Sequence, residues 1–240
     1  MGKTAILIDG GFYRKQAKFL FGKKSPELRA DELMEYCFRH LREQHGSSIT
    51  YRELYRIFYY DCEPSEKTVQ HPLTQQTIFL KNSPQFQWSK DFYKALASKR
   101  KVALRMGEVL DSGTGYRLKP EALKKLCSKE ISVDDLTVSD FTLDIQQKGV
   151  DMRIGLDIAS LAHKQLVDQI VLIAGDSDFV PAAKYARREG IDFILDPMWH
   201  TIKDSLYIHI DGLQQRSQKP PFHINDSLHI SHVSTDTTQK

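Results

Sequence analysis

Four short runs of apolar residues, each bounded by turn or polar residues, punctuate the chain. A strand inside a parallel sheet is covered on both faces, so it is apolar throughout instead of alternating. The runs therefore predict buried parallel strands, over residues 4–8, 55–60, 169–174 and 191–195. About fifteen residues with helical spacing separate the last two strands, which is typical of a β-α-β unit.

Apolar residues spaced by three and four positions predict helices that pack on this sheet. The pattern is clearest over residues 151–164, with Asp151 in the first turn, and over residues 179–188, which Gly190 closes. Two N-terminal helices are predicted over residues 12–20 and 31–43. Strands that alternate with helices in this way predict a three-layer α/β fold with a central, mainly parallel sheet flanked by helices.

Residues 63–110 interrupt the alternation, and we interpret them as an insertion. Prolines break the first half of this segment, after which residues 89–99 predict a helix and residues 102–110 an extra strand. We expect one enlarged domain over residues 1–213, because a chain of this length and apolar content can bury a single full core. Residues 214–240 are polar, lack a periodic apolar face and predict a mobile C-terminal tail.

Composition excludes several classes of protein. No apolar run reaches the roughly 18 residues of a membrane helix and no signal-peptide zones open the chain, so we expect a cytoplasmic protein without a membrane partner. The three cysteines are far apart and form no CxxC pair, which argues against a disulfide framework and a thiolate zinc site. With 34 basic and 31 acidic residues the net charge is only +3, so any affinity for nucleic acid must come from local basic patches.

Aspartates follow all four predicted strands. They are Asp9, Asp61, Asp176 and Asp196. In an open parallel sheet, ligands bind outside the carboxyl ends of the strands, so these side chains are candidates for one shared edge. Asp178 stands two residues after Asp176, and Asp151 begins a predicted helix. Each acid alone is explained equally well as a helix cap or a turn residue, and it is their joint occurrence that points to a site.

Carboxylates that gather in one place repel one another, and a divalent cation turns this repulsion into coordination. Oxygen ligands favour hard ions, here Mg²⁺ or Mn²⁺ rather than zinc. Such an ion can activate a water molecule, align it with a phosphodiester and neutralise the charge on the leaving oxygen. The acid cluster therefore predicts metal-assisted hydrolysis without a protein nucleophile.

Other charged residues are candidates for supporting roles. Asp157 lies about 120° around its helix from Asp151, which makes it a candidate for the second shell, together with Asp61 and Asp196. Candidates for phosphate binding are Lys148, Arg14 and Arg105. The structural alternative is a solvated charge for Lys148 and Arg14, and a salt bridge for Arg105, which interrupts an apolar strand.

Three motifs stand out along the chain: ILIDGGF at residues 6–12, KGVDMRIGLDIA at 148–159 and LIAGDSDFVPAAKYARREG at 172–190. Together they resemble the NYN domain family, most closely its bacterial LabA-like (DUF88) branch. HPL at 71–73, ALRMGE at 103–108 and LDPM at 195–198 extend the likeness to about residue 213. Many members of the family carry Asn after the first IDG turn, where this chain has Gly11 and then Phe12.

The resemblance implies a PIN-like nuclease fold that cleaves RNA with Mg²⁺ or Mn²⁺. The acids that correspond to the family's metal site are Asp9, Asp151, Asp176 and Asp178. It also implies RNA as the partner, in single-stranded or unpaired regions, and a homo-oligomer stays an open alternative.

Our first hypothesis is therefore a metal-dependent ribonuclease in which the aspartate cluster holds a metal-activated water. The alternatives are a non-catalytic RNA- or protein-binding regulatory module on the same fold, and a phosphatase for small phosphate esters. An aspartyl-nucleophile phosphatase would usually carry a second acid two residues after Asp9, where Gly11 stands.

Overall fold

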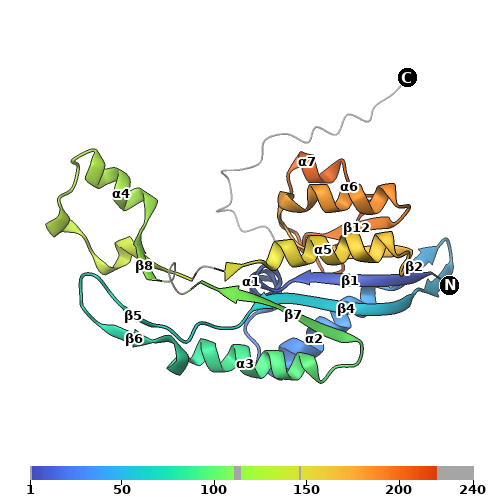
Figure 1. The fold of residues 1–240 in the computed structure, drawn as a ribbon, viewed down its shortest axis with the longest axis horizontal. Helices are drawn as coiled ribbons and strands as arrows, with labels where there is room; N and C mark the ends of the chain where they lie inside the picture. Colours follow the sequence, from blue (N-terminus) through green and yellow to red (C-terminus); the bar gives the residue numbers. More distant parts are fainter. Residues whose placement is uncertain (1, 111–114, 146, 221–240) are drawn as a thin grey trace.

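The computed structural model describes residues 2–110, 115–145 and 147–220, and within them seven strands form one twisted sheet (Figure 1). Six strands are parallel, and the seventh, β10, pairs antiparallel with its neighbour at one edge. In spatial order the strands are β10 (Gln147–Lys148), β7 (Val102–Val109), β4 (Glu53–Cys62), β1 (Lys3–Asp9), β11 (Gln169–Ile173), β12 (Asp192–Asp196) and β13 (Gly212–Leu213). The four predicted core strands are confirmed to within two residues at each end.

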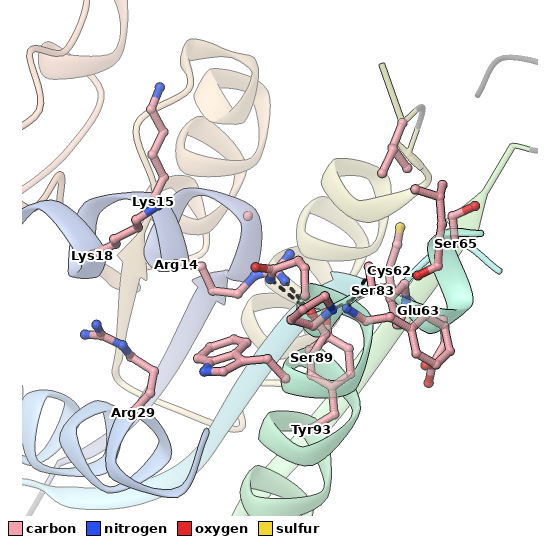
Figure 2. Close-up of a pocket in the computed structure, with 18 of the residues that line it drawn as sticks. Arg14, Lys15, Lys18, Arg29, Cys62, Glu63, Ser65, Ser83, Ser89 and Tyr93 are labelled. Atoms are coloured by element: carbon pink, nitrogen blue, oxygen red, sulfur yellow. Dashed lines mark hydrogen bonds between the residues drawn. The ribbon is translucent and has the colours of Figure 1, made fainter. Parts of the chain in front are cut away.

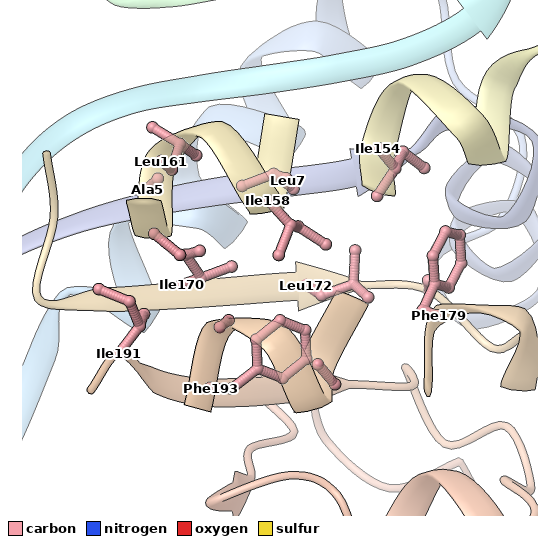
Figure 3. Packing of buried hydrophobic residues seen from close by; sticks show 14 of the residues in the cluster. Ala5, Leu7, Ile154, Ile158, Leu161, Ile170, Leu172, Phe179, Ile191 and Phe193 are labelled. Atoms are coloured by element: carbon pink, nitrogen blue, oxygen red, sulfur yellow. The ribbon is translucent and has the colours of Figure 1, made fainter. Parts of the chain in front are cut away.

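Helices cover both faces of the sheet (Figure 1). One face packs against α5 (Val150–His163) and α6 (Val180–Arg188), as Figure 3 shows at close range. The other face packs against α1 (Gly10–Phe21), α2 (Pro26–His40) and α3 (Pro84–Ala97). The predicted three-layer α/β architecture with a central, mainly parallel sheet is confirmed.

Strand β1 shows why the predicted strands are apolar throughout. Ala5 and Leu7 belong to the core under α5, whereas Ile6 and Ile8 belong to the core on the opposite face. All four are fully buried. Successive side chains of a strand point to opposite faces, so a strand between two helical layers needs an apolar residue at every position.

Both boundaries of one predicted helix were wrong, and the helix predicted over residues 89–99 starts earlier, at Pro84. The helix expected over residues 31–43 is α2, which starts earlier because the Ser25 hydroxyl accepts a hydrogen bond from the Leu28 amide and Pro26 follows the cap. That helix ends at His40, and the chain enters a hairpin. Its strands are β2 (Arg42–His45) and β3 (Ser48–Tyr51).

The segment interpreted as an insertion divides into two parts. β7 is not an added strand, because it pairs with β4 inside the central sheet, and α3 covers that sheet. Two hairpins and one helix extend beyond the sheet on the side where the parallel strands end (Figure 1). They are β5 (Thr68–Gln70) with β6 (Thr77–Phe79), β8 (Gly115–Leu118) with β9 (Phe141–Asp144), and α4 (Pro120–Cys127).

The remaining regular elements are short. They are the 3₁₀ turns Leu80–Asn82, Val133–Asp135, Val138–Asp140 and Ser177–Phe179, and the one-turn helix α7 (Asp204–Tyr207). Most of the tail predicted over residues 214–240 lies outside the described residues. No helix in the described part of the chain is both long and apolar enough to cross a bilayer.

Candidate functional site

Asp9 ends β1 and at the same time caps helix α1. Its Oδ1 accepts a hydrogen bond of 3.1 Å from the backbone amide of Phe12, as expected of an aspartate at an N-cap. The pKa of Asp9 is raised to about 6, mainly by burial and in addition by the charges of Asp151 and Asp61, against the lowering effect of the hydrogen bond from the Phe12 amide. The carboxyl group at the centre of the predicted site is therefore poorly hydrated and faces other acids.

Asp151 lies in the first turn of α5, which Gly149 starts in a left-handed conformation with φ of 82°. The carboxyl group is exposed, yet its pKa is raised, first by partial burial and then by the charges of Asp176 and Asp178. Asp9 ends β1, and Asp176 and Asp178 follow β11. The first turn of α5 therefore places Asp151 at the edge of the sheet where these two strands end. Asp151 thus interacts through its charge with the other three acids of the first hypothesis.

Asp176 and Asp178 belong to the turn that follows β11. Asp176 caps the 3₁₀ turn, because its Oδ1 accepts a hydrogen bond of 3.1 Å from the amide of Asp178. Both side chains are exposed. The capping explanation therefore holds for Asp9 and Asp176, and it is compatible with a site because a cap uses one carboxylate oxygen and leaves the other free.

A hollow of about 340 Å³ lies beside Asp9 and Asp176. Gly175 lines it, and a Cβ at this position would lie 2.5 Å from a ring carbon of Phe12 and 2.9 Å from one of His200. Those two rings meet edge to face with 5.8 Å between their centroids. The remaining residues around the hollow are Ser177, Thr201 and Lys203.

The loop after β12 supplies residues that sequence reasoning missed, Thr201 and Lys203 among them. Lys203 Nζ donates to Ser177 Oγ at 3.1 Å, which ties this loop to the turn after β11. The loop bends back because Met198 and Trp199 both adopt left-handed conformations, with φ of 46° and 66°. Two adjacent non-glycine residues in this region are uncommon, and the amino-acid pattern carries no signal for them.

The buried carboxylate of Asp196 stabilises this bend of the loop. Asp196 is fully buried, and its carboxylate accepts hydrogen bonds from Tyr36 Oη at 2.5 Å and from the Met198 amide at 2.8 Å. His40 Nε2 lies 2.8 Å from the same carboxylate. Asp196 thus holds the loop that carries His200, and it does not face the hollow.

The candidates for the second shell point in different directions. Asp61 is buried on the α1 and α3 side, where it pairs with Arg14 at 2.9 Å and accepts a hydrogen bond from Tyr59. Side chains alternate between the two faces along a strand, which explains why Asp61 and Asp196 face the layer of α1 and α3. Tyr59 and Ile194 face that layer, and each acid stands two positions further along the same strand.

Asp157 accepts a hydrogen bond of 2.8 Å from Tyr60 Oη and pairs with Arg105 at 3.1 Å. The Arg105 guanidinium also lies over the Phe58 ring, 5.3 Å from its centroid. The salt bridge expected as the structural explanation of Arg105 is therefore present. Lys148 is exposed on the edge strand β10.

The donor chemistry of the four acids suits a hard divalent cation, since all their ligand atoms are carboxylate oxygens. The raised pKa values of Asp9 and Asp151, to which neighbouring acids contribute, indicate negative charge that a cation would relieve. Within the described residues no three acid, histidine or cysteine side chains already stand close enough to hold an ion. Binding would require these carboxylates to move closer to one another.

Comparison with known proteins gives one family. The model of the NYN domain matches residues 98–198, a segment that includes Asp151, Asp176 and Asp178 and leaves out Asp9. No curated protein matches this chain. Among solved structures, a protein of unknown function from Vibrio parahaemolyticus is similar with a TM-score of 0.43 and 14% identity, over 88% of this chain and 91% of that one.

Proposed function

We propose that this chain is a ribonuclease that depends on Mg²⁺ or Mn²⁺ and uses Asp9, Asp151, Asp176 and Asp178 as its metal-binding acids. The observation that carries the proposal is the electrostatic coupling of these acids, which come from three separate elements at one end of the sheet. The match to the NYN domain supports a nuclease-like fold and RNA as the substrate. We assign the chain to the LabA-like branch on the motifs that surround these acids.

A bound divalent cation would supply an activated water and stabilise the charge that develops on the phosphate. The protein's own contribution is to place the ligands. The cap of α1 orients Asp9, and the first turn of α5 presents Asp151. Lys203 lines the same hollow as Asp9 and Asp176, where its ammonium group can bind a non-bridging phosphate oxygen.

Cleavage of a labelled single-stranded RNA tests the proposal. The wild-type protein should cut it with Mn²⁺ or Mg²⁺ and stop when a chelator is added. Asp176→Asn should reduce the rate by about a hundredfold or more, since it removes a ligand of the cation. Asp134→Asn is the matched control, because Asp134 is an exposed aspartate in the 3₁₀ turn Val133–Asp135 and lines neither hollow described for this structure. Equal rates for the wild-type protein and Asp176→Asn would refute the site.

One observation favours a second function, a binding module without turnover. The ring of Phe12 lines the hollow at the start of α1, close to the position where many NYN proteins carry a polar Asn. An apolar ring there cannot orient a water molecule or a metal ligand. Tight RNA binding without metal-stimulated cleavage over a broad panel of RNAs would establish this alternative.

A further inference from the structure

A second, larger hollow of about 960 Å³ lies on the α1 and α3 side of the molecule (Figure 2). Its walls are α1 and the loop into α2 on one side, and α3 with residues 62–65 on the other. β9 and the residue after it, Leu143 and Ile145, contribute a third wall. We call this hollow the basic groove, because of the charges that surround it.

Cationic side chains outnumber anionic ones around the basic groove by six to one. The cationic residues are Arg14, Lys15, Lys18, Lys23, Lys24 and Arg29, and the acid is Glu63. Glu63 is itself paired with Lys90 at 3.0 Å, which weakens its field in the groove. On a chain with a net charge of only +3, this is a marked local concentration of positive charge.

Three of these cations already have anionic partners. Arg14 pairs with Asp61, and Lys24 and Arg29 share Glu32. Arg29 is buried and also donates to carbonyl groups at the end of α1, so it is a structural residue.

The other three cations have no such partner. Across the described part of the chain Lys15, Lys18 and Lys23 form no ion pair and no side-chain hydrogen bond, and all three are exposed. Figure 2 shows Lys15 and Lys18 on α1, across the groove from Ser83 and Ser89. Three unpaired ammonium groups along one wall are suited to a chain of phosphates.

Aromatic rings line the opposite wall, on α3. Trp88 stacks on Phe92 with 5.0 Å between ring centroids, and its Nε1 donates to the Lys24 carbonyl, so it is held in place. Tyr93 is buried and donates to the Cys62 carbonyl. Phe86 is partly exposed, and its ring has no aromatic neighbour in the described structure. A free ring opposite a row of lysines is the arrangement that binds single-stranded nucleic acid.

The basic groove also adjoins the acids. Gly11 lines the groove, whereas Asp9 and Phe12 line the smaller hollow, so the first turn of α1 separates the two. A strand that left the acidic hollow across this turn would enter the basic groove directly.

We propose that the basic groove binds the single-stranded segment of RNA next to the bond that is cut, with phosphates on Lys15, Lys18 and Lys23 and a base on Phe86. The choice of RNA rests on the proposed function. An acidic peptide would satisfy the lysines equally well, but it would leave the partly exposed ring of Phe86 without a stacking partner.

Binding of a fluorescent oligouridylate, measured by anisotropy in the presence of a chelator, tests the groove without any cleavage. The triple variant Lys15→Ala, Lys18→Ala, Lys23→Ala should bind about a hundredfold more weakly near about 0.1 M salt, and its salt dependence should be shallower by about two charges. The control, Lys94→Ala, Lys164→Ala, Lys184→Ala, removes the same charge from exposed, unpaired lysines that do not line the groove and should bind like the wild-type protein. Equal weakening in both triple variants would overturn the proposal.

A second comparison tests the base contact. Phe86→Ala should weaken binding of the single strand by about tenfold, since stacking on an aromatic ring contributes at this level. Phe79→Ala, which removes an exposed ring outside the groove, should not. Equally tight binding of double-stranded RNA, or competition by polyglutamate at the same concentration as RNA, would also overturn the proposal.

Cleavage separates this inference from the proposed function. If the groove binds RNA as described but Mn²⁺ stimulates no cleavage, the nuclease proposal fails and the groove stands. If Mn²⁺ stimulates cleavage and both triple variants bind alike, the groove fails and the nuclease stands.

Discussion

Asp9 shows how one side chain can serve both the fold and the site. As an N-cap it satisfies the Phe12 amide, and as a poorly hydrated acid among other acids it is held away from its preferred ionised state. The cap favours the charged form, while burial and neighbouring charges disfavour it. The net result is a carboxyl group whose ionisation costs the folded protein free energy until a cation neutralises it.

Replacing Asp9 should therefore stabilise the metal-free protein. The pKa of Asp9 in the folded protein, about 6, lies above its ordinary value of 3.8. The protonated carboxyl group therefore contributes fully to stability when the pH is below the ordinary pKa, and this contribution is lost as the pH rises through the pKa of the folded protein. Asn keeps the cap without the charge. Asp9→Asn should raise the free energy of unfolding by on the order of 2 kcal/mol at about pH 7.5, and by almost nothing near about pH 3.

Urea unfolding at both pH values, in the presence of a chelator, measures this difference. An Asp9→Asn variant that is less stable than the wild-type protein at the higher pH would show that ionisation of Asp9 does not destabilise the folded protein. Asp134→Asn should change stability little at either pH, because that carboxyl group is exposed.

Gly175 should tolerate no larger side chain. A Cβ at this position would meet the rings of Phe12 and His200, and the displaced rings would cost about 1–3 kcal/mol of stability. Gly155→Ala is the control, since a Cβ there meets open space on α5 and should stabilise that helix by about 0.5–1 kcal/mol. Thermal unfolding of the two variants should show shifts of opposite sign, and shifts of the same sign would contradict this packing of the hollow.

At the residue scale the sequence predicted which acids stand at strand ends but not which way they face. Asp9, Asp61 and Asp196 all follow apolar runs, and only the register shows that the last two face the α1 and α3 layer. Their partners Arg14, Tyr36 and His40 come from distant positions in the chain. Sequence spacing alone carries no information about such pairings.

At the element scale the prediction worked where a pattern is local. The strands and α5 are apolar at the spacing their geometry requires, so both were found. The strand predicted over residues 102–110 is present as β7, but its place in the central sheet depends on pairing with β4, which no local pattern shows. The prediction failed for the start of α2, although Ser25 and Pro26 carried the capping signal.

The loop after β12 depends on a single buried acid. Asp196→Ala would leave Tyr36, His40 and the Met198 amide without their acceptor, and we expect a loss of about 3–5 kcal/mol. Tyr36→Phe removes one of these hydrogen bonds and should cost about 1–2 kcal/mol. Chemical denaturation of both variants measures the difference. A loss below 1 kcal/mol for Asp196→Ala, about the level of one ordinary hydrogen bond, would show that the loop is held by other contacts.

For the whole molecule, opposite charges are separated around the start of α1. Acids gather where β1, β11 and α5 meet, and unpaired lysines follow α1 away from them. The near-neutral net charge hides this division, so composition alone could not predict the basic groove. The groove also depends on α3, which lies in the segment that the sequence pattern assigned to an insertion.

The central claim is that the acids form one metal site, and a titration with Mn²⁺ followed by calorimetry tests it without assuming any substrate. The wild-type protein should bind the ion, Asp176→Asn should bind it at least about tenfold more weakly, and Asp134→Asn should match the wild-type protein. Asp176→Asn that binds Mn²⁺ as tightly as the wild-type protein would contradict the account.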